Sequence, residues 1–343
     1  MSAENPATET TGEPALWSAV GDLHHRFLTG LILALVTRQG TPRAAEVVFR
    51  TFRHQHLELF RPGLTKLGLD DEPDAVACAK YHVLSNALGG VGVVWIPESD
   101  TKSWVRYYPP RWIFDGTAIC GVPTEVSRAM LRGWHGHNGV SLDNPNLGFV
   151  ATMQTTDGQP GLEGYYVEED HPLDEDERVR FRPGERPPGE PVELPVPTWG
   201  PDRLAKVERN YALAYIRSIL PAMCAVLGPA DAAGTGRTAA RQIGMQYHAA
   251  VMAPLDASRP FAERMRALLA AHGSAVAVAG AAGSTDTVAI DRWSVVDAGT
   301  PAEAFECWNG LWEGMAAMEG LRLTVSDRLD HGDPTTTWRI SSA

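Results

Sequence analysis

The chain has 343 residues, which is longer than one ordinary domain and close to the length of two. Hydrophobic residues make up 44% and charged residues 21% of it, a globular composition that excludes a wholly disordered chain. Thirty Lys and Arg against 42 Asp and Glu give a formal net charge of −12. We therefore expect no nucleic-acid and no membrane partner, because the surface that would neutralise phosphate groups is missing.

Residues 1–15 are small and polar, which predicts a disordered tail. They lack the basic and then apolar pattern of a signal peptide, and no apolar run in the chain reaches the roughly 18 residues that span a bilayer. The four cysteines stand far apart, without the paired spacing of a disulfide framework or a zinc ribbon. These features predict a soluble, cytoplasmic protein.

The first half of the chain, residues 16–178, begins with three stretches whose apolar spacing predicts helices. They lie at 16–36, 42–60 and 72–88. Two β-like runs around a turn follow at 91–108, then a helix entered from Pro123, and then a hairpin at 147–168. The pair Asp157-Gly158 is a typical turn at the centre of this hairpin.

Residues 179–202 are rich in proline, with seven in 24 positions (Pro183, Pro187, Pro188, Pro191, Pro195, Pro197 and Pro201). Such a segment can be neither a helix interior nor a central strand. We interpret it as a semi-extended linker, long enough to wrap one of the two parts that it joins.

The second half, residues 203–343, repeats the pattern of the first. Predicted helices lie at 211–227, 237–252 and 261–272, followed by β-like runs at 276–293, a helix entered from Pro301 and a hairpin at 321–340. At one constant spacing the halves share five residues: Trp134/Trp308, Gly136/Gly310, Leu147/Leu321, Gly158/Gly332 and Pro160/Pro334. With small gaps, His56 also falls opposite His248 and His82 opposite His272.

This agreement predicts an α+β fold made of two tandem related domains, each with helices packed on a small antiparallel sheet and each with its own core. The alternative is chance matching in an alanine-rich chain. In a duplicated protein, residues kept in both copies are often structural and residues kept in one copy carry chemistry. Trp134 and Gly136 are then fold residues, whereas His135 and His137, which do not recur in the second half, are candidates for function.

Two His-x-His pairs raise the question of a metal, since neutral imidazole binds Zn, Fe, Cu or Ni. His54 and His56 lie in a helical pattern that points them about 200° apart. His135 and His137 stand at a glycine-rich helix end, where the backbone could bring them together. A metal alternative therefore uses His135 and His137, with His56 or His82, as ligands of Zn or Fe. The preferred hypothesis needs no cofactor.

The run WVRYYPPRW, residues 104–112, sets aromatic rings beside guanidinium groups at a strand end and its exit. Such a set can bind a flat or carboxylated ligand by stacking and by paired hydrogen bonds. Strand alternation sends Arg106 and Tyr108 to one face and Tyr107 to the other. The structural alternative is that aromatic residues favour strands and that Pro109-Pro110 ends one.

The closing part of the second half resembles the L-2-amino-thiazoline-4-carboxylic acid hydrolase family of small bacterial enzymes. The residues that carry the resemblance are Cys307-Trp308-Asn309-Gly310, then Gly332-Asp333, then the last strand TTTWRI. Gly310 stands where that family's pattern has Asp, and Thr336 where it has a second Cys. Members are about half as long as this chain, so the resemblance implies two copies of their fold. It also implies that a small polar or heterocyclic compound is bound and hydrolysed, with Cys307 and Asp333 as further candidate residues.

The first functional hypothesis is a hydrolase that cleaves or ring-opens a C–N bond of a small substrate. His135 or His137 would act as the base toward water, Tyr107 or Tyr108 would donate a hydrogen bond, and Arg106 or Arg111 would hold an anionic group. The flanking rings of Trp104, Trp112 and Trp134 would bind the substrate.

Two other hypotheses stay open from the sequence. One is a non-catalytic protein that binds an aromatic compound or a tetrapyrrole. The other is an inert scaffold, which predicts no concave site where residues 134–138 meet residues 107–112. The expected partner is a small molecule, and a homodimer is left open.

Overall fold

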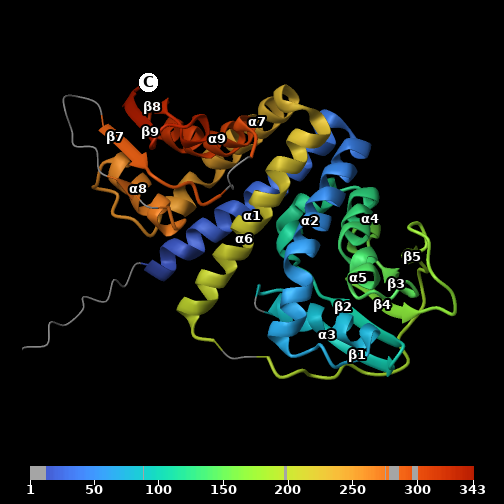
Figure 1. Ribbon diagram of the computed structural model, residues 1–343. Helices are drawn as coiled ribbons and strands as arrows, with labels where there is room; N and C mark the ends of the chain where they lie inside the picture. The colour runs from blue at the N-terminus through green and yellow to red at the C-terminus, as the bar shows by residue number, and fades with distance from the viewer. Residues whose placement is uncertain (1–12, 88, 197–198, 275, 278–285, 296–299) are drawn as a thin grey trace, which may run out of the picture.

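The computed structural model describes residues 13–343, except 88, 197–198, 275, 278–285 and 296–299 (Figure 1). Residues 1–12 of the predicted tail lie outside the described part of the chain. The boundary predicted at residue 15 is wrong, because the first helix already begins at Glu13.

The first half forms α1 (Glu13–Gln39), α2 (Thr41–Leu67), α3 (Asp74–Ala87), β1 (Val93–Ser99), β2 (Lys102–Tyr107), η1 (Trp112–Phe114), η2 (Gly116–Gly121), α4 (Thr124–Gly133), η3 (His135–His137), α5 (Asn138–Ser141), β3 (Leu147–Met153), η4 (Thr155–Asp157), β4 (Leu162–Glu168) and β5 (Val179–Phe181). The second half forms α6 (Pro201–Leu227), α7 (Pro229–Met252), α8 (Phe261–Ala271), β6 (Val276–Ala277), β7 (Asp286–Ile290), α9 (Ala302–Met318), β8 (Leu321–Asp327), η5 (Leu329–His331) and β9 (Thr336–Ser342). The α+β class predicted from the sequence is confirmed.

The first two helices of each half are joined in the same way, by a single glycine. Gly40 separates α1 from α2 with φ 85°, and Gly228 separates α6 from α7 with φ 80°. Glycine adopts this positive φ without the steric cost that a side chain brings. A proline stands in the first turn of α2 and of α7, where its missing N–H would have no partner in any case. The same local chemistry therefore makes the same sharp turn twice.

The two sheets have the same strand order over four strands. The first is β1-β2-β4-β3-β5 and the second is β6-β7-β9-β8. All pairs are antiparallel except β3 with β5. β3 shifts register between Ala151 and Met153, and β8 does so between Val325 and Asp327. The closing hairpins thus match residue for residue at the constant spacing of the sequence identities.

That constant spacing does not extend to the helices. The turn that ends α3 has Gly90 at φ 72° and Val91 N–H bonded to Asn86 O, and the turn after α8 has Gly273 at φ 86° and Ser274 N–H bonded to Leu269 O. Matching these turns puts His272 opposite Gly89, so the proposed pairing of His82 with His272 is wrong by about two helical turns.

Glycines at the helix crossings shift the Trp134/Trp308 pairing as well. A side chain at Gly133 would lie 2.6 Å from Phe49 O of α2, and one at Gly310 would lie 2.6 Å from Arg237 O of α7. Gly133 therefore corresponds in packing to Gly310, and the sequence match of Trp134 with Trp308 is displaced by about one turn of helix.

The long helices α1 and α6 cross at the centre of the molecule, between the two sheets (Figure 1). At the crossing a side chain on Gly21 would lie 3.3 Å from the backbone of Arg209. α1 packs mainly against α6 and α7 of the other half, and α2 against α4 and α6. One cluster of buried hydrophobic residues runs through both halves, so the expectation of two separate cores is wrong.

Both central helices are long and apolar enough, by length and composition alone, to cross a membrane. In the folded chain 67% of the most apolar window of α1 and 56% of that of α6 are buried inside the protein. Their apolar composition is accounted for by burial in the shared core.

The proline-rich segment follows the edge and face of the first sheet (Figure 1). Its start, β5, pairs in parallel with β3, and Val192 forms an isolated bridge with Trp95 of β1. Phe149 N–H donates to Arg178 O at 2.8 Å and Arg182 N–H donates to Ala151 O at 2.9 Å. The segment is therefore extended, as its prolines predict, and fastened to the sheet at two places.

Candidate functional site

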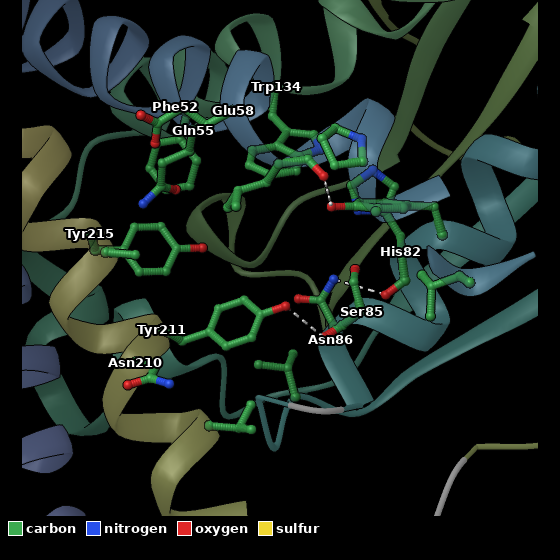
Figure 2. A pocket seen from close by; sticks show the side chains of 18 of the residues that line it. Phe52, Gln55, Glu58, His82, Ser85, Asn86, Trp134, Asn210, Tyr211 and Tyr215 are labelled. Atoms are coloured by element: carbon green, nitrogen blue, oxygen red, sulfur yellow. Dashed lines mark hydrogen bonds between the residues drawn. The ribbon is translucent and has the colours of Figure 1, made fainter. Parts of the chain in front are cut away.

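A pocket of about 450 Å³ lies between α2, α3 and α6. We call it the central pocket. Its walls are mainly aromatic and apolar, with Phe52, Leu59, Tyr81, Tyr107, Met130, Trp134, Tyr211 and Tyr215 among the lining residues. Figure 2 shows Gln55, Tyr215, Tyr211 and Trp134 around its open space. The first half supplies most of the wall, and α6 of the second half closes it.

The central pocket brings together several residues that the sequence singled out. Tyr107, Arg111, Trp134 and His135 all line it, together with His82. Tyr107 and Arg111 flank Pro109-Pro110, Trp134 and His135 follow the end of α4, and His82 comes from α3. The pocket thus lies where residues 134–138 meet residues 107–112. An inert scaffold predicts no concave site at that junction, so this prediction is wrong.

His135 takes its place because α4 stops at Gly133 and the chain continues as a 3-10 turn. Its buried ring stacks on His82, with ring centroids 4.4 Å apart and planes 4° apart. The Tyr107 hydroxyl lies 3.3 Å from His135 Nε2 and forms a hydrogen bond whose direction depends on the imidazole tautomer. Burial, and then the nearby His82 and Arg111, hold the pKa of His135 well below its ordinary value.

His82 is neutral near pH 7 for the same reason. Burial, together with the positive charge of Arg111, lowers its pKa to about 3. Stacked neutral imidazoles can hydrogen-bond a ligand, but each is a weak base. A carboxylate bonded to the ring would stabilise a charged imidazolium. In the described chain no hydrogen bond or ion pair joins either ring to a carboxylate.

Arg111 is the cation of the central pocket. Its guanidinium lies 5.5 Å from the ring centre of Tyr107 and 5.4 Å from that of Phe114, and it contacts Met130 Sδ at 3.4 Å. Burial lowers its pKa. Within the described residues no acidic side chain forms an ion pair with it. A half-buried guanidinium in a pocket wall, with no acidic partner, is suited to a carboxylate or similar anion.

Several buried polar atoms around the central pocket also lack a hydrogen-bond partner. They include both amide atoms of Gln55, His82 Nε2 and Trp134 Nε1. Gln55 is only 2% exposed and lines the pocket. Buried amide and indole groups normally have a partner, because an unmade hydrogen bond costs about 1–3 kcal/mol. These atoms therefore have unused hydrogen-bonding capacity beside the central pocket, although each is almost fully buried.

The other histidines of the first half form a second pair beside Trp134. His56 and His137 meet edge to face with centroids 5.3 Å apart, and His56 Nε2 lies 2.9 Å from Ser141 Oγ. His54 points to solvent and pairs with Glu58, as the helical spacing predicts. Across the described ranges no group of three or more His, Cys, Asp or Glu side chains could hold a metal ion. The ligand set His135, His137, His56 and His82 is thus not assembled here.

Three predicted site residues of the 104–112 segment do not line the central pocket. Arg106 forms an ion pair with the buried Glu163. Tyr108 is 42% exposed. Trp104 packs with Tyr165 in a small separate cluster, and its indole donates to Glu98. The side chain of Trp112 lies outside the described part of the structure. Alternation along β2 was predicted correctly, but Tyr107 alone faces the helices.

Cys307 and Asp333, the candidates implied by the family resemblance, have structural roles. The thiol of Cys307 is buried where α9 crosses α7, it donates to Ala232 O at 3.2 Å, and burial raises its pKa to about 12. The Asp333 carboxylate is exposed and accepts from Arg328 N–H at 2.8 Å. Neither lines the central pocket, so the structure does not bring them into this candidate site.

The sequence reasoning missed the wall that α6 contributes. Tyr211 and Tyr215 stand four residues apart on one face of this helix, and the Tyr211 hydroxyl donates to Ser85 O at 3.3 Å (Figure 2). This spacing was visible as an aromatic pair on one helix face. Gln55 gave no signal, because a single polar residue on an amphipathic helix ordinarily faces solvent.

Comparison with family models, with curated proteins and with solved structures gives no match to this chain. The likeness to the thiazoline hydrolase family stays a prediction from short motifs. Function has to be argued from the central pocket itself.

Proposed function

We propose that the protein binds a small, flat aromatic or heteroaromatic molecule that carries an acidic group. The observation that carries the proposal is Arg111, a half-buried cation in the wall of the central pocket that no acidic side chain of the described chain neutralises. A carboxylate placed against its guanidinium would form paired, charge-assisted hydrogen bonds.

The remaining wall supports a flat ligand. Tyr81, Tyr107, Trp134 and Tyr215 supply aromatic surfaces, which bind planar rings by stacking and edge contacts. The unpaired amide of Gln55 can donate to and accept from a ring heteroatom. A volume of about 450 Å³ suits one molecule of this size.

Binding titrations of Arg111 variants test this proposal. The probes are indole-3-carboxylate, nicotinate and benzoate, each compared with its uncharged carboxamide. We expect the acids to bind the wild type more tightly than the amides, and Arg111→Gln to lower the affinity for the acids about 10- to 100-fold, since a hydrogen bond to a charged group contributes about 1.5–3 kcal/mol. Arg111→Lys keeps the charge and should lose less.

The matched control is Arg38→Gln, because Arg38 is exposed and outside the central pocket. Its affinities should equal those of the wild type. Equal binding of acids and amides, or no effect of Arg111→Gln, would overturn the assignment of the anion site.

A second candidate function, hydrolysis of the bound compound, is favoured by one contact. The Tyr107 hydroxyl and His135 Nε2 are 3.3 Å apart, so the pair could pass a proton to a substrate at the edge of the pocket. The low pKa of His135 favours binding over this reaction. Incubating the acids, and cyclic amides that carry a carboxylate, with wild type and His135→Ala separates the two functions. An enzyme loses turnover and largely keeps affinity in the variant.

A further inference from the structure

A second concave site lies on the far side of the second half, between α9, β8 and the exposed face of α7. It measures about 690 Å³. Its lining is more polar than apolar: arginines and glutamates line it together with apolar side chains, among them Phe305, Leu323 and Val325. We call this site the β8 groove. It shares no lining residue with the central pocket.

The first sheet shows what can occupy a groove at this edge of the sheet. Its strand β3, which matches β8 in register and in the position of its bulge, is covered by β5 in parallel. There Phe149 N–H donates to Arg178 O and Ala151 O accepts from Arg182 N–H. The positions of β8 that match Phe149 and Ala151 are Leu323 and Val325.

The edge of β8 has no such cover. It is the last strand of its sheet, and within the part of the chain that the structure describes no strand or backbone hydrogen bond covers the outer side of Leu323 to Val325. An edge strand with free N–H and C=O groups is a template for another strand.

Side chains of β5 fill the space between β3 and the helices of the first half. Val179 packs so closely on Gly136 that a Cβ there would lie 2.8 Å from it, and Phe181 lies under Arg128 of α4, 4.5 Å from the guanidinium. In the second half the corresponding space between β8 and α9 is the β8 groove. An extended segment with apolar side chains two residues apart would fill it in the same way.

The charges around the β8 groove favour acidic side chains on that segment. Its lining holds four arginines and two glutamates. Arg237 and Arg241 share the single carboxylate of Glu313, and Arg328 is paired with Asp330 and Glu306. Exposed Arg322 forms no ion pair in the described ranges. Positive charge in excess at a rim attracts and orients an acidic partner.

We propose that the β8 groove binds an extended, acidic segment of a partner protein, which adds to β8 as a parallel strand and places an apolar-x-apolar pair between β8 and α9. A second copy of this chain fits less well. Two β8 strands related by a twofold axis would pair antiparallel, edge to edge, and leave the groove unfilled.

The probe for this test is a fluorescein-labelled peptide with the sequence of residues 174–181, the segment that covers β3, carrying Arg178→Glu and Arg180→Glu. Anisotropy with the full chain should show saturable binding that weakens as salt is raised. Arg241→Glu/Arg322→Glu should weaken binding by about tenfold or more. The control Arg339→Glu reverses an exposed charge on β9 outside the groove and should leave affinity unchanged.

The variant Leu323→Pro removes the N–H that the peptide would use, at an edge where proline is tolerated, and should abolish binding while circular dichroism stays that of the wild type. No binding of the peptide, or equal binding by the charge-reversal variants, overturns the proposal. So does sedimentation that shows a dimer dissociated by Leu323→Pro, because a second copy would then occupy the β8 groove. Titration of the central pocket is a separate measurement, so the two proposals fail independently.

Discussion

In the second half of the chain the indole of Trp308 is fully buried and donates to His24 Nε2 at 3.2 Å. His24 comes from α1 of the other half, and its Nδ1 is held by Val20 O at 2.8 Å. In the first half the indole of Trp134 borders the central pocket, and its Nε1 has no partner. A buried tryptophan is thus satisfied by the chain in one half and is open to a ligand in the other.

The helix that crosses each half explains part of this difference. α1 and α6 are both 27 residues long and end at the matching glycines Gly40 and Gly228, so Ala212 occupies the place on α6 that His24 occupies on α1. Trp134 also lies about one helical turn from the packing equivalent of Trp308, because Gly133 corresponds to Gly310. A methyl group fills less space than an imidazole. The other cause is the break in α4 after Gly133, which turns Trp134 and His135 toward the central pocket, whereas α9 continues through Trp308 to Met318.

The largest expected effect is that of acid on the buried histidines, which are more numerous in the first half. Burial lowers the pKa of His82 and His56 to about 3, and that of His137 and His24 to about 4. The unfolded imidazoles take up protons near pH 6.5, so between pH 6.5 and about 4 the unfolded chain binds more protons and stability falls as pH falls. Urea unfolding at pH 7, 6 and 5 should show a fall of several kcal/mol.

The same urea unfolding series on His82→Gln measures how much one buried histidine of the first half contributes to the pH dependence. This variant removes one titrating group beside the central pocket and should show a smaller fall between pH 7 and pH 5. A free energy of unfolding that does not change over this range would contradict the burial of neutral histidines in both halves.

The next effect is the loss of packing around the two tryptophans. Trp308 contacts Phe305, Trp312 and Trp338 in a closed core, so Trp308→Ala should lower the free energy of unfolding by about 3–5 kcal/mol. Trp134→Ala should lower it by less than half as much, because its ring already borders a pocket, and should weaken binding of the acid probes. If the two variants lost the same unfolding free energy in chemical denaturation, Trp134 would be packed as tightly as Trp308. The two halves would then not differ by an open pocket at Trp134.

Much of the fold follows from the sequence, because periodicity and turn residues are local. The predicted order of helices and hairpins is the observed one, and Asp157-Gly158 forms the expected left-handed turn, with Gly158 at φ 77°. The common origin of the two halves stays a prediction. What the sequence could not supply was the packing between them: α1 and α6 are apolar around most of their surface, so no stripe indicates which partner each helix takes.

In the candidate site, too, residues with a local sequence signal were predicted and those placed by long-range contacts were not. Tyr107, Arg111 and His135 were predicted because their segments are short and chemically dense. Arg106 was wrongly predicted to line the site because the sequence does not reveal its partner. Glu163 is 57 residues away, and only the pairing of β2 with β4 brings the two side chains together. The wall from α6 depended on a long-range contact, and the aromatic pair Tyr211 and Tyr215 did not indicate which part of the chain it faces. Cys307 was chosen from a motif too short to fix its surroundings.

A smaller effect, of opposite sign, is expected at Arg111. Replacing it with methionine keeps the approximate length of the side chain and removes a half-buried cation that no acidic side chain of the described chain neutralises. The free energy of unfolding should rise by about 1 kcal/mol, since burying an unpaired charge is costly, while the acid probes should no longer bind. Thermal unfolding without ligand measures the first result and titration the second. A less stable variant would show that Arg111 already has a stabilising partner in the folded chain.

The smallest effect concerns a turn at which the two halves are alike. Gln159 accepts from Gln154 N–H at 2.6 Å, and Asp333 accepts from Arg328 N–H at 2.8 Å, at matching positions after η4 and η5. Each alanine variant, Gln159→Ala and Asp333→Ala, should lose about 0.5–1.5 kcal/mol of unfolding free energy, with binding of the acid probes unchanged. Matched small losses would support the equivalence of the hairpins. If Asp333→Ala instead abolished ligand binding or turnover at full stability, the chemistry would lie in the second half, and the contrast between an open and a filled half would have to be reversed.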